Sequence, residues 1–303
     1  MQQQTSYIDI YEHVTNTIIA LLEQGTVPWQ KPWITSGPPR NLLTGHWYAG
    51  INYMLLNALP YKLPYYLTFR QVKSVAGKVK AGEKAHMLVF RRQITEPDKN
   101  DATKTVIRFV LRHFWVFNIS QCENIPPHLI GKAQLLLKHK DPIQECEFVV
   151  EGYKTCPTIR YSGDEAYYHS VLDVVNMPFM EKFVSQEKFY SALFHELVHS
   201  TGHASRLNRK EVVEANEFGS DEYSVEELVA EMGACYISSF CGIVSETIDN
   251  SAAYINGWLN SLKNDKKFIV QASSRAQKAV DYILNIDRSR EKNTDVPAEP
   301  ESA

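Results

Sequence analysis

Residues Phe194–Arg209 read FHELVHSTGHASRLNR and place His195 and His199 four positions apart. On an α-helix, side chains at positions i and i+4 lie on one face, so both imidazoles can reach a single metal ion. Glu196 lies between them, where its carboxylate would point toward a water molecule bound to that ion. Apolar residues recur beside this face at helical spacing, and Gly202 follows where a helix-ending glycine belongs. The stretch therefore predicts a metal-binding helix.

The whole chain has the composition of a globular protein that is long enough for two domains. Of its 303 residues, 44% are hydrophobic and 22% are charged, and the net charge is −3. The cysteines are five, an odd number, and form no CxxC pair, which favours free thiols in a reducing compartment over disulfides. No secretory signal begins the chain, and no run of ~18 apolar residues occurs in it. We therefore expect a cytoplasmic protein that does not contact a membrane.

Charge is unevenly distributed along the chain. The segment Tyr61–Arg92 contains one acid, Glu83, among the following bases: Lys62, Arg70, Lys73, Lys78, Lys80, Lys84, Arg91 and Arg92. A basic region in a nearly neutral chain favours a polyanionic partner for that region alone.

Aromatic residues are interleaved with these bases, a combination that is typical of single-strand binding. Lys and Arg pair with phosphates, while unstacked bases lie on exposed ring faces. The alternative is an ordinary basic surface over an aromatic core. The candidate DNA-binding residues are Trp29, Trp33, Arg40, Trp47, Tyr48, Arg70, Lys73, Lys78, Lys80, Lys84, Arg91 and Arg92.

Hydrophobic periodicity predicts an α+β protein. We expect a small α+β domain with an antiparallel sheet over residues 1–125, a linker over 126–144, the metal-binding domain over 145–287 and a disordered tail over 288–303. In the first domain, strands Ala85–Arg91 and Thr105–Phe117 are expected to form a hairpin. In the second, Asp173–Met177 is expected as an edge strand, because Pro178 ends it, and an extended peptide could pair along that edge.

A catalytic zinc site needs a third protein ligand besides the two histidines. The metzincin spacing places a histidine where this chain has Ser205, so that subclass is excluded. Glu227, on a second predicted helix that reads VEELVAE, fits the gluzincin arrangement, and Glu231 one turn later can accept the free N–H of a ligand histidine. Glu226 and His203 compete with Glu227 as third ligand. For the three glutamates, Glu226, Glu227 and Glu231, the alternative is a solvated acidic helix face.

The ligand types favour Zn²⁺, with Mn²⁺ or another divalent ion as alternatives. Glu196 is expected to act as general base in the hydrolysis of a peptide bond. Tyr223 or His203 is expected to stabilise the resulting oxyanion. The predicted fold is therefore α+β with a zincin-like C-terminal domain.

Longer segments of the chain resemble those of a known family. They are AYYHSVLDVVNMP (166–178), HELVHSTGH (195–203) followed by RLNR, YSVEELVAE (223–231), PWQKPW (28–33), NLLTGHWYAGIN (41–52) and LTFRQVKSVAGKVKAGEKA (67–85). These segments resemble the ArdC antirestriction family of conjugative plasmids and the related region of plasmid TraC primases, over nearly the whole chain. The three N-terminal segments occur in the family's order.

The resemblance implies an N-terminal domain that binds single-stranded DNA, a C-terminal zincin-like metallopeptidase domain, and protection of incoming conjugative DNA from host restriction. It also implies a cytoplasmic protein of a bacterial host. The protein either stays in that cytoplasm or passes to the recipient cell during conjugation. Two alternatives remain open. One is a protein that coats single-stranded DNA and whose metal site is structural or regulatory. The other is a cytosolic metallopeptidase whose basic domain recruits an unknown protein substrate.

Overall fold

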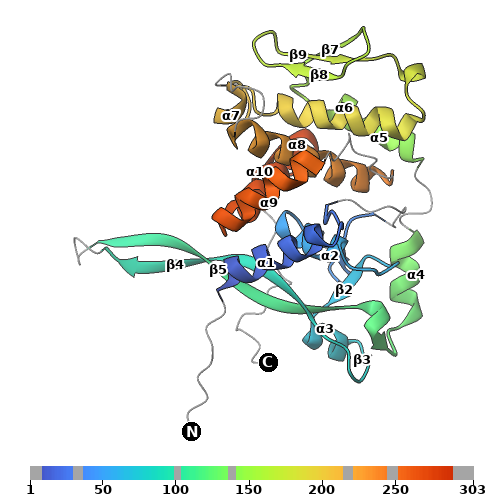
Figure 1. Cartoon of the computed structure of the whole chain (residues 1–303). Helices are drawn as coiled ribbons and strands as arrows, with labels where there is room; N and C mark the ends of the chain where they lie inside the picture. Colours follow the sequence, from blue (N-terminus) through green and yellow to red (C-terminus); the bar gives the residue numbers. More distant parts are fainter. Residues whose placement is uncertain are drawn as a thin grey trace.

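The structure is a computed structural model that describes residues 9–29, 37–98, 104–135, 141–213, 221–243 and 252–288. It confirms a mixed α+β architecture, in which a region built on a sheet and short helices packs against a helical region with a small second sheet (Figure 1). Among the described helices, none combines the length and apolarity that a membrane crossing requires.

A four-stranded sheet organises the N-terminal region, with the strand order β1-β2-β5-β4. Its strands are β1 (Arg40–Asn41), β2 (Tyr65–Leu67), β4 (His86–Pro97) and β5 (Thr105–Asn118). The β1–β2 pair is parallel and the others are antiparallel. The predicted β4–β5 hairpin is confirmed, but β4 continues beyond its predicted end at Arg91, because its outer residues still pair with β5 as far as Pro97 opposite Thr105.

Short helices and a two-stranded ladder complete this region. They are α1 (Ile10–Glu23), α2 (Ile51–Asn57), α3 (Phe69–Ser74), α4 (Pro127–Leu135), the 3₁₀ turn Ile119–Gln121, β3 (Lys78–Val79) and β6 (Cys122–Glu123). The side chain of Asp9 accepts hydrogen bonds from the amides of Tyr11 and Glu12 and so begins α1. The segment predicted as a linker, 126–144, contains α4, whose Leu129 and Ile130 pack against a hydrophobic cluster of the N-terminal region.

The C-terminal region is mainly helical. Its elements are α5 (Pro142–Gly152), β7 (Thr158–Tyr161), β8 (Tyr167–His169), β9 (Val174–Met177), the 3₁₀ turn Met180–Lys182, α6 (Gln186–Ser200), α7 (Lys210–Val213), α8 (Asp221–Cys241), α9 (Ala252–Asn264) and α10 (Phe268–Ile283). The three strands form a sheet beside α6 (Figure 1).

The prediction that Asp173–Met177 forms a sheet edge is wrong. The order β7-β9-β8 puts β9 in the centre, where it pairs in parallel with β7 and antiparallel with β8. Pro178 only follows the last paired residue, so it removes no hydrogen bond from the ladder. An incoming peptide strand would therefore have to pair with β7 or β8.

The two predicted domains share one hydrophobic core. A single cluster contains buried residues of α1, α2 and β4 together with buried residues of α5, α6, α8, α9 and α10. The Tyr236 hydroxyl of α8 donates a hydrogen bond to the Gly50 carbonyl at 3.0 Å, and the ring of Tyr53 lies 4.4 Å from that of Tyr236. The Gly50 amide in turn donates to Gln277 of α10 at 2.9 Å. Packing therefore joins the regions rather than leaving them connected by a linker alone.

Gly233 determines how closely α8 approaches α6. A Cβ at this position would lie 2.7 Å from Cγ2 of Val198, which is closer than side-chain carbons approach. Because the two helices meet there, Gly233→Ala is expected to destabilise the fold by about 1–3 kcal/mol through overpacking. Chemical denaturation of the purified protein measures this change.

The matched control is Gly257→Ala in α9, where a Cβ would meet no atom within 4 Å. Alanine in an open helical position is expected to leave stability unchanged or raise it by up to about 1 kcal/mol. Equal effects of the two substitutions would contradict the close helix contact.

Candidate metal centre

Three side chains from two helices converge on one point. The Nε2 atoms of His195 and His199 lie 3.1 Å apart. His195 Nε2 lies 3.4 Å from Oε2 of Glu227, and His199 Nε2 lies 3.4 Å from Oε1 of the same carboxylate. The ligand atoms of the three residues all lie within 4.8 Å of one another. With metal–ligand bonds of about 2.0–2.1 Å, neighbouring ligand atoms of a tetrahedral site are roughly 3.3 Å apart. The observed separations therefore fit a divalent metal ion held by two imidazoles and one carboxylate.

Helix α6 supplies both histidines, and its position is fixed by an N-terminal cap and by the burial of most of its residues. The Ser185 side chain accepts a hydrogen bond from the Lys188 amide at 3.2 Å and caps the helix, as the sequence predicts. Most residues of α6 are buried, including the glutamate of the motif, Glu196. Helix α8 lies against α6 and supplies Glu227.

The opposite nitrogen of each histidine faces another carboxylate of α8. The Nδ1 atom of His195 lies 3.5 Å from Glu231, and that of His199 lies 3.0 Å from Glu226. A carboxylate acceptor at Nδ1 holds the proton there and leaves Nε2 free to bind a metal. The sequence EELVAE thus provides one ligand and two groups that orient ligands.

A buried arginine fixes Glu226 in this role. The Arg209 guanidinium donates two hydrogen bonds to Glu226, from Nε at 2.8 Å and from an Nη atom at 2.6 Å. It also donates to the Val198 carbonyl and the Thr201 hydroxyl, at 2.8 and 2.6 Å, where α6 ends. Glu226 is accordingly directed to Nδ1 of His199 and lies outside the group of ligand atoms, so the structure favours Glu227 over Glu226 as third ligand.

The electrostatics of the group agree with its geometry. Burial opposes protonation of His199, but Glu227 and Glu226 together outweigh it and raise the pKa of His199 to about 9. Burial opposes protonation of His195 as well, but the nearby carboxylates of Glu227 and Glu231 outweigh it and raise the pKa of His195. Burial opposes ionisation of Glu227, yet the two histidines hold its pKa well below the ordinary value. The pocket therefore favours positive charge between these side chains.

Of the two other residues predicted for catalysis, His203 is not brought into this group. The ring of His203 is bonded to Ser205, at 2.8 Å from the hydroxyl, and does not join the ligand atoms. Helix α6 ends at Ser200, before the turn that would carry His203 to the same face. Tyr223 belongs to α8, but its side chain lies outside the described residues.

The structure divides the predicted DNA-binding residues into buried and exposed groups. Trp29 and Tyr48 are 1% and 4% exposed, so neither ring offers a face for base stacking. Trp29 packs against Trp258 of α9. Arg40 is half-buried over the ring of Trp47, which in turn packs on Phe240. Trp33 lies outside the described residues. The exposed candidates are Arg70, Lys73, Lys78, Lys80, Lys84, Arg91 and Arg92.

Arg206 lies after α6 in the same loop as Arg209 and links the small sheet to the metal-binding helix. Arg206 donates to both carboxylate oxygens of Asp173 at 2.8 Å and to the Ser200 carbonyl at 3.0 Å. Neither Arg206 nor Arg209 was predicted from the sequence as a site residue. Their only signal was the RLNR segment directly after the motif, and their acidic partners lie on other elements.

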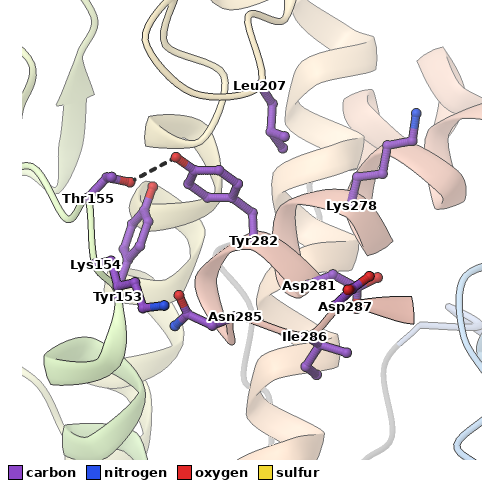
Figure 2. Close-up of a pocket in the computed structure, with 10 residues that line it drawn as sticks. All are labelled: Tyr153, Lys154, Thr155, Leu207, Lys278, Asp281, Tyr282, Asn285, Ile286 and Asp287. Atoms are coloured by element: carbon purple, nitrogen blue, oxygen red, sulfur yellow. Dashed lines mark hydrogen bonds between the residues drawn. The ribbon is translucent and has the colours of Figure 1, made fainter. Parts of the chain in front are cut away.

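A separate pocket of about 480 Å³ opens between the ends of α5 and α10 and the loop after α6 (Figure 2). The Thr155 hydroxyl donates to that of Tyr282 at 3.1 Å across one side of it. None of its lining residues is a member of the metal-binding group: Tyr153, Lys154, Thr155, Leu207, Lys278, Asp281, Tyr282, Asn285, Ile286 and Asp287. The pocket is thus distinct from the candidate metal centre.

The fold and the metal-binding group place this region in a known class. Residues 150–275 match the family described as zincin-like metallopeptidase, and residues 8–117 match the N-terminal domain of anti-restriction factor ArdC. The chain therefore belongs to the ArdC antirestriction family and carries a zincin-like metallopeptidase domain. This confirms the resemblance found in the sequence and the prediction of a divalent-metal site.

Two crystal structures of the antirestriction protein ArdC from plasmid R388 are similar to this chain. Both are 33% identical to it and cover 92% of it. The TM-score is 0.75 for the metal-free structure, of which 97% is matched, and 0.74 for the Mn(II)-bound structure, of which 98% is matched. The fold of this chain is thus equally close to both forms.

Curated relatives include DNA primases and a protein of similar length. The chain is 31% identical to an Escherichia coli DNA primase TraC over 299 residues, which cover 92% of the chain and 20% of the primase. A second Escherichia coli TraC is also 31% identical, with 96% and 28% covered. The uncharacterized protein y4eC of Sinorhizobium fredii (strain NGR234) is 30% identical over 294 residues, which are 91% of each chain. The chain therefore spans less than a third of the primases.

The contact between Arg209, Glu226 and His199 yields a prediction about metal affinity. Glu226→Gln removes the charge that retains the proton on Nδ1, and Arg209→Lys cannot make two parallel bonds to the carboxylate. Each substitution is expected to weaken metal binding roughly 10- to 100-fold. Competition titration of the metal against a chromophoric chelator gives the dissociation constants.

Arg206→Lys is the matched control, because Arg206 belongs to the same loop and pairs with Asp173 instead of Glu226. It is expected to retain near wild-type metal affinity. Melting temperatures recorded in excess chelator show whether a substitution destabilises the metal-free protein. They therefore separate a general loss of folding from a specific loss of metal affinity. An equal loss of metal affinity in the control would refute a specific role for the Arg209–Glu226 pair.

Proposed function

We propose that this chain is an antirestriction protein that binds single-stranded DNA and hydrolyses peptide bonds in a protein substrate, and so protects incoming conjugative DNA. The single observation that carries the enzymatic part is the convergence of His195 and His199 of α6 with Glu227 of α8, because Glu196 lies beside them on the buried helix α6. Membership of the ArdC family supports the DNA-binding and protective parts.

Each side chain of the site has a separate role in the proposed hydrolysis of a peptide bond. His195, His199 and Glu227 would hold a divalent ion, which when bound would supply a Lewis acid for the peptide carbonyl and lower the pKa of a water molecule. Glu196 accepts a proton from the attacking water and delivers it to the nitrogen of the departing amine. Glu226 and Glu231 keep both imidazoles in the tautomer in which Nε2 carries no proton.

The DNA-binding part is supported by the exposed bases. Lys78, Lys80 and Lys84 follow one another on β3 and the adjoining turn, and all are exposed. The Lys80 side chain donates to the Ser120 carbonyl at 2.8 Å, which holds it near the neighbouring 3₁₀ turn. We assign this basic segment, Lys78–Lys84, to contacts with DNA phosphates, together with Arg70 and Lys73 of α3.

The assigned general base is tested by Glu196→Gln, which keeps the size of the side chain and removes its basicity. Hydrolysis of fluorescently labelled, unfolded casein by the metal-loaded protein, with a single-stranded oligonucleotide present, is expected to fall at least about 100-fold. Metal content and DNA affinity are expected to remain at wild-type values.

Glu187→Gln in the first turn of α6 is the control, since Glu187 is exposed and precedes the motif on the same helix without being part of it. Casein hydrolysis that survives in the Glu196 variant would sink the assignment of the base. Transfer of an unmodified plasmid into a restricting recipient then measures protection from restriction. Full protection by the Glu196 variant would favour the alternative in which the protein protects by coating the strand.

The DNA-binding part is tested by removing the charges of the basic segment. The triple substitution of Lys78, Lys80 and Lys84 by alanine is expected to weaken binding of a single-stranded oligonucleotide. If all three contact phosphates, the slope of log K against log salt falls by roughly 2, because about 0.7 counterions per contact are no longer released. Fluorescence anisotropy at several salt concentrations measures both quantities.

Lys278→Ala removes an exposed lysine from α10 and serves as the charge control. It is expected to change neither the affinity nor the salt slope. A wild-type protein that binds duplex more tightly than single strand, or with no salt dependence, would contradict the proposed DNA-binding function.

A further inference from the structure

The outer half of the β4–β5 hairpin is an arm that projects from the body of the molecule (Figure 1). We define it as Arg91–Pro97 of β4 and Thr105–Arg112 of β5. The inner half is anchored, with Leu88, Phe114 and Val116 buried in a hydrophobic cluster. In the arm, no described residue is buried, and most are exposed. The arm is therefore held in place by its base and offers both faces to a partner.

One face of the arm carries exposed apolar side chains. Phe109 and Ile107 are 65% and 60% exposed. The register places Gln93 opposite Phe109, Thr95 opposite Ile107 and Arg91 opposite Leu111. Since side chains alternate along a strand, these six lie on the same face, and Arg91 is a diagonal neighbour of Phe109. An exposed phenylalanine beside an exposed isoleucine on a projecting strand pair is a feature that soluble proteins otherwise avoid.

The charge of the arm indicates the class of partner. Its two strands contain Arg91, Arg92, Arg108 and Arg112 and a single acid, Glu96. Arg108 is 3.6 Å from Glu96, and both side chains are about half exposed. The other three arginines leave the arm positively charged. Arg91 lies on the apolar face, and Arg92, Arg108 and Arg112 lie on the opposite face of the same strand pair. An apolar face on a positively charged arm complements a nucleic acid strand better than a neutral protein surface.

We propose that the arm binds single-stranded DNA, with Phe109 stacked on an unpaired base, Gln93 next to the edge of that base and Arg91 on the adjacent phosphate. Only a single strand presents free base faces, because stacking occupies them in a duplex. The proposal rests on the proposed DNA-binding function and adds to it a second contact region, besides the basic segment Lys78–Lys84. Ile107 extends the apolar platform toward the tip of the arm.

The experiment uses the full chain and an oligonucleotide that contains 2-aminopurine, whose fluorescence is quenched or enhanced as its stacking changes. Phe109→Leu keeps an apolar side chain but removes the ring, and is expected to weaken binding roughly 5- to 100-fold and to abolish the fluorescence change. Phe109→Tyr keeps the ring and is expected to restore both. Phe148→Leu replaces a ring on α5 that is 55% exposed, and is expected to change neither.

The outcomes separate the arm from the proposed function itself. If Phe109→Leu binds DNA like the wild type while the alanine variant of the basic segment is weakened, the arm proposal is overturned and the function stands. If the wild type does not bind single strands, both fail. If Phe109→Leu retains DNA affinity but alters the molar mass measured by light scattering, the arm joins copies of this chain and the proposal is likewise overturned.

Discussion

The close contact between α6 and α8 is the constraint on which the metal centre depends. The three ligand atoms come from both helices, so their separation is set by the distance between the helix axes. At the contact, Gly233 leaves room for Val198, the residue directly before His199. A larger side chain there would move α8 outward and carry Glu227 away from both Nε2 atoms. Core packing and ligand geometry are therefore consequences of the same helix contact.

Helix α8 also connects the metal centre with the N-terminal region. Glu227 lies toward one end of the helix, while Tyr236, further along, packs on Tyr53 and bonds to the Gly50 carbonyl. Helix α10 adds the bond from Gln277 to the Gly50 amide. One hydrophobic cluster contains buried residues of both regions, so α8 and α10 pack directly on the N-terminal region.

Local patterns in the sequence predicted the elements well, whereas long-range contacts escaped them. The helix spacing of the HELVH motif, the Ser185 cap and the alternation in β5 are properties of neighbouring residues, and the structure confirms each element. The central position of β9 depends on parallel pairing with β7, which no local pattern encodes. The burial of Trp29 likewise depends on Trp258, far along the chain.

The same distinction applies within the site. The i and i+4 spacing on one helix suggested His195 and His199 directly, and the gluzincin arrangement, with a carboxylate on a second helix, suggested Glu227. Arg209 could not be found in this way, since its segment looks like a polar loop and its partner is on another element. The choice between Glu226 and Glu227 was also undetermined, because adjacent residues of a helix point only about 100° apart. The position of Arg209, which binds Glu226, favours Glu227.

A buried ion pair is rarely the most stable solution, so the Arg209–Glu226 pair calls for a reason beyond stability. Removing two charges from water costs several kcal/mol per ion, and apolar residues of similar volume often stabilise a core at least as well. An apolar residue at position 226, however, could not accept a hydrogen bond from Nδ1 of His199. A lone glutamate there would be a buried charge without a counter-charge, and protonation would turn it into a poorer acceptor. Burial opposes ionisation of Glu226, but Arg209 outweighs it and lowers the pKa of this carboxyl. Arg209 thus keeps Glu226 ionised, which is the state in which it fixes the orientation of a metal-binding histidine.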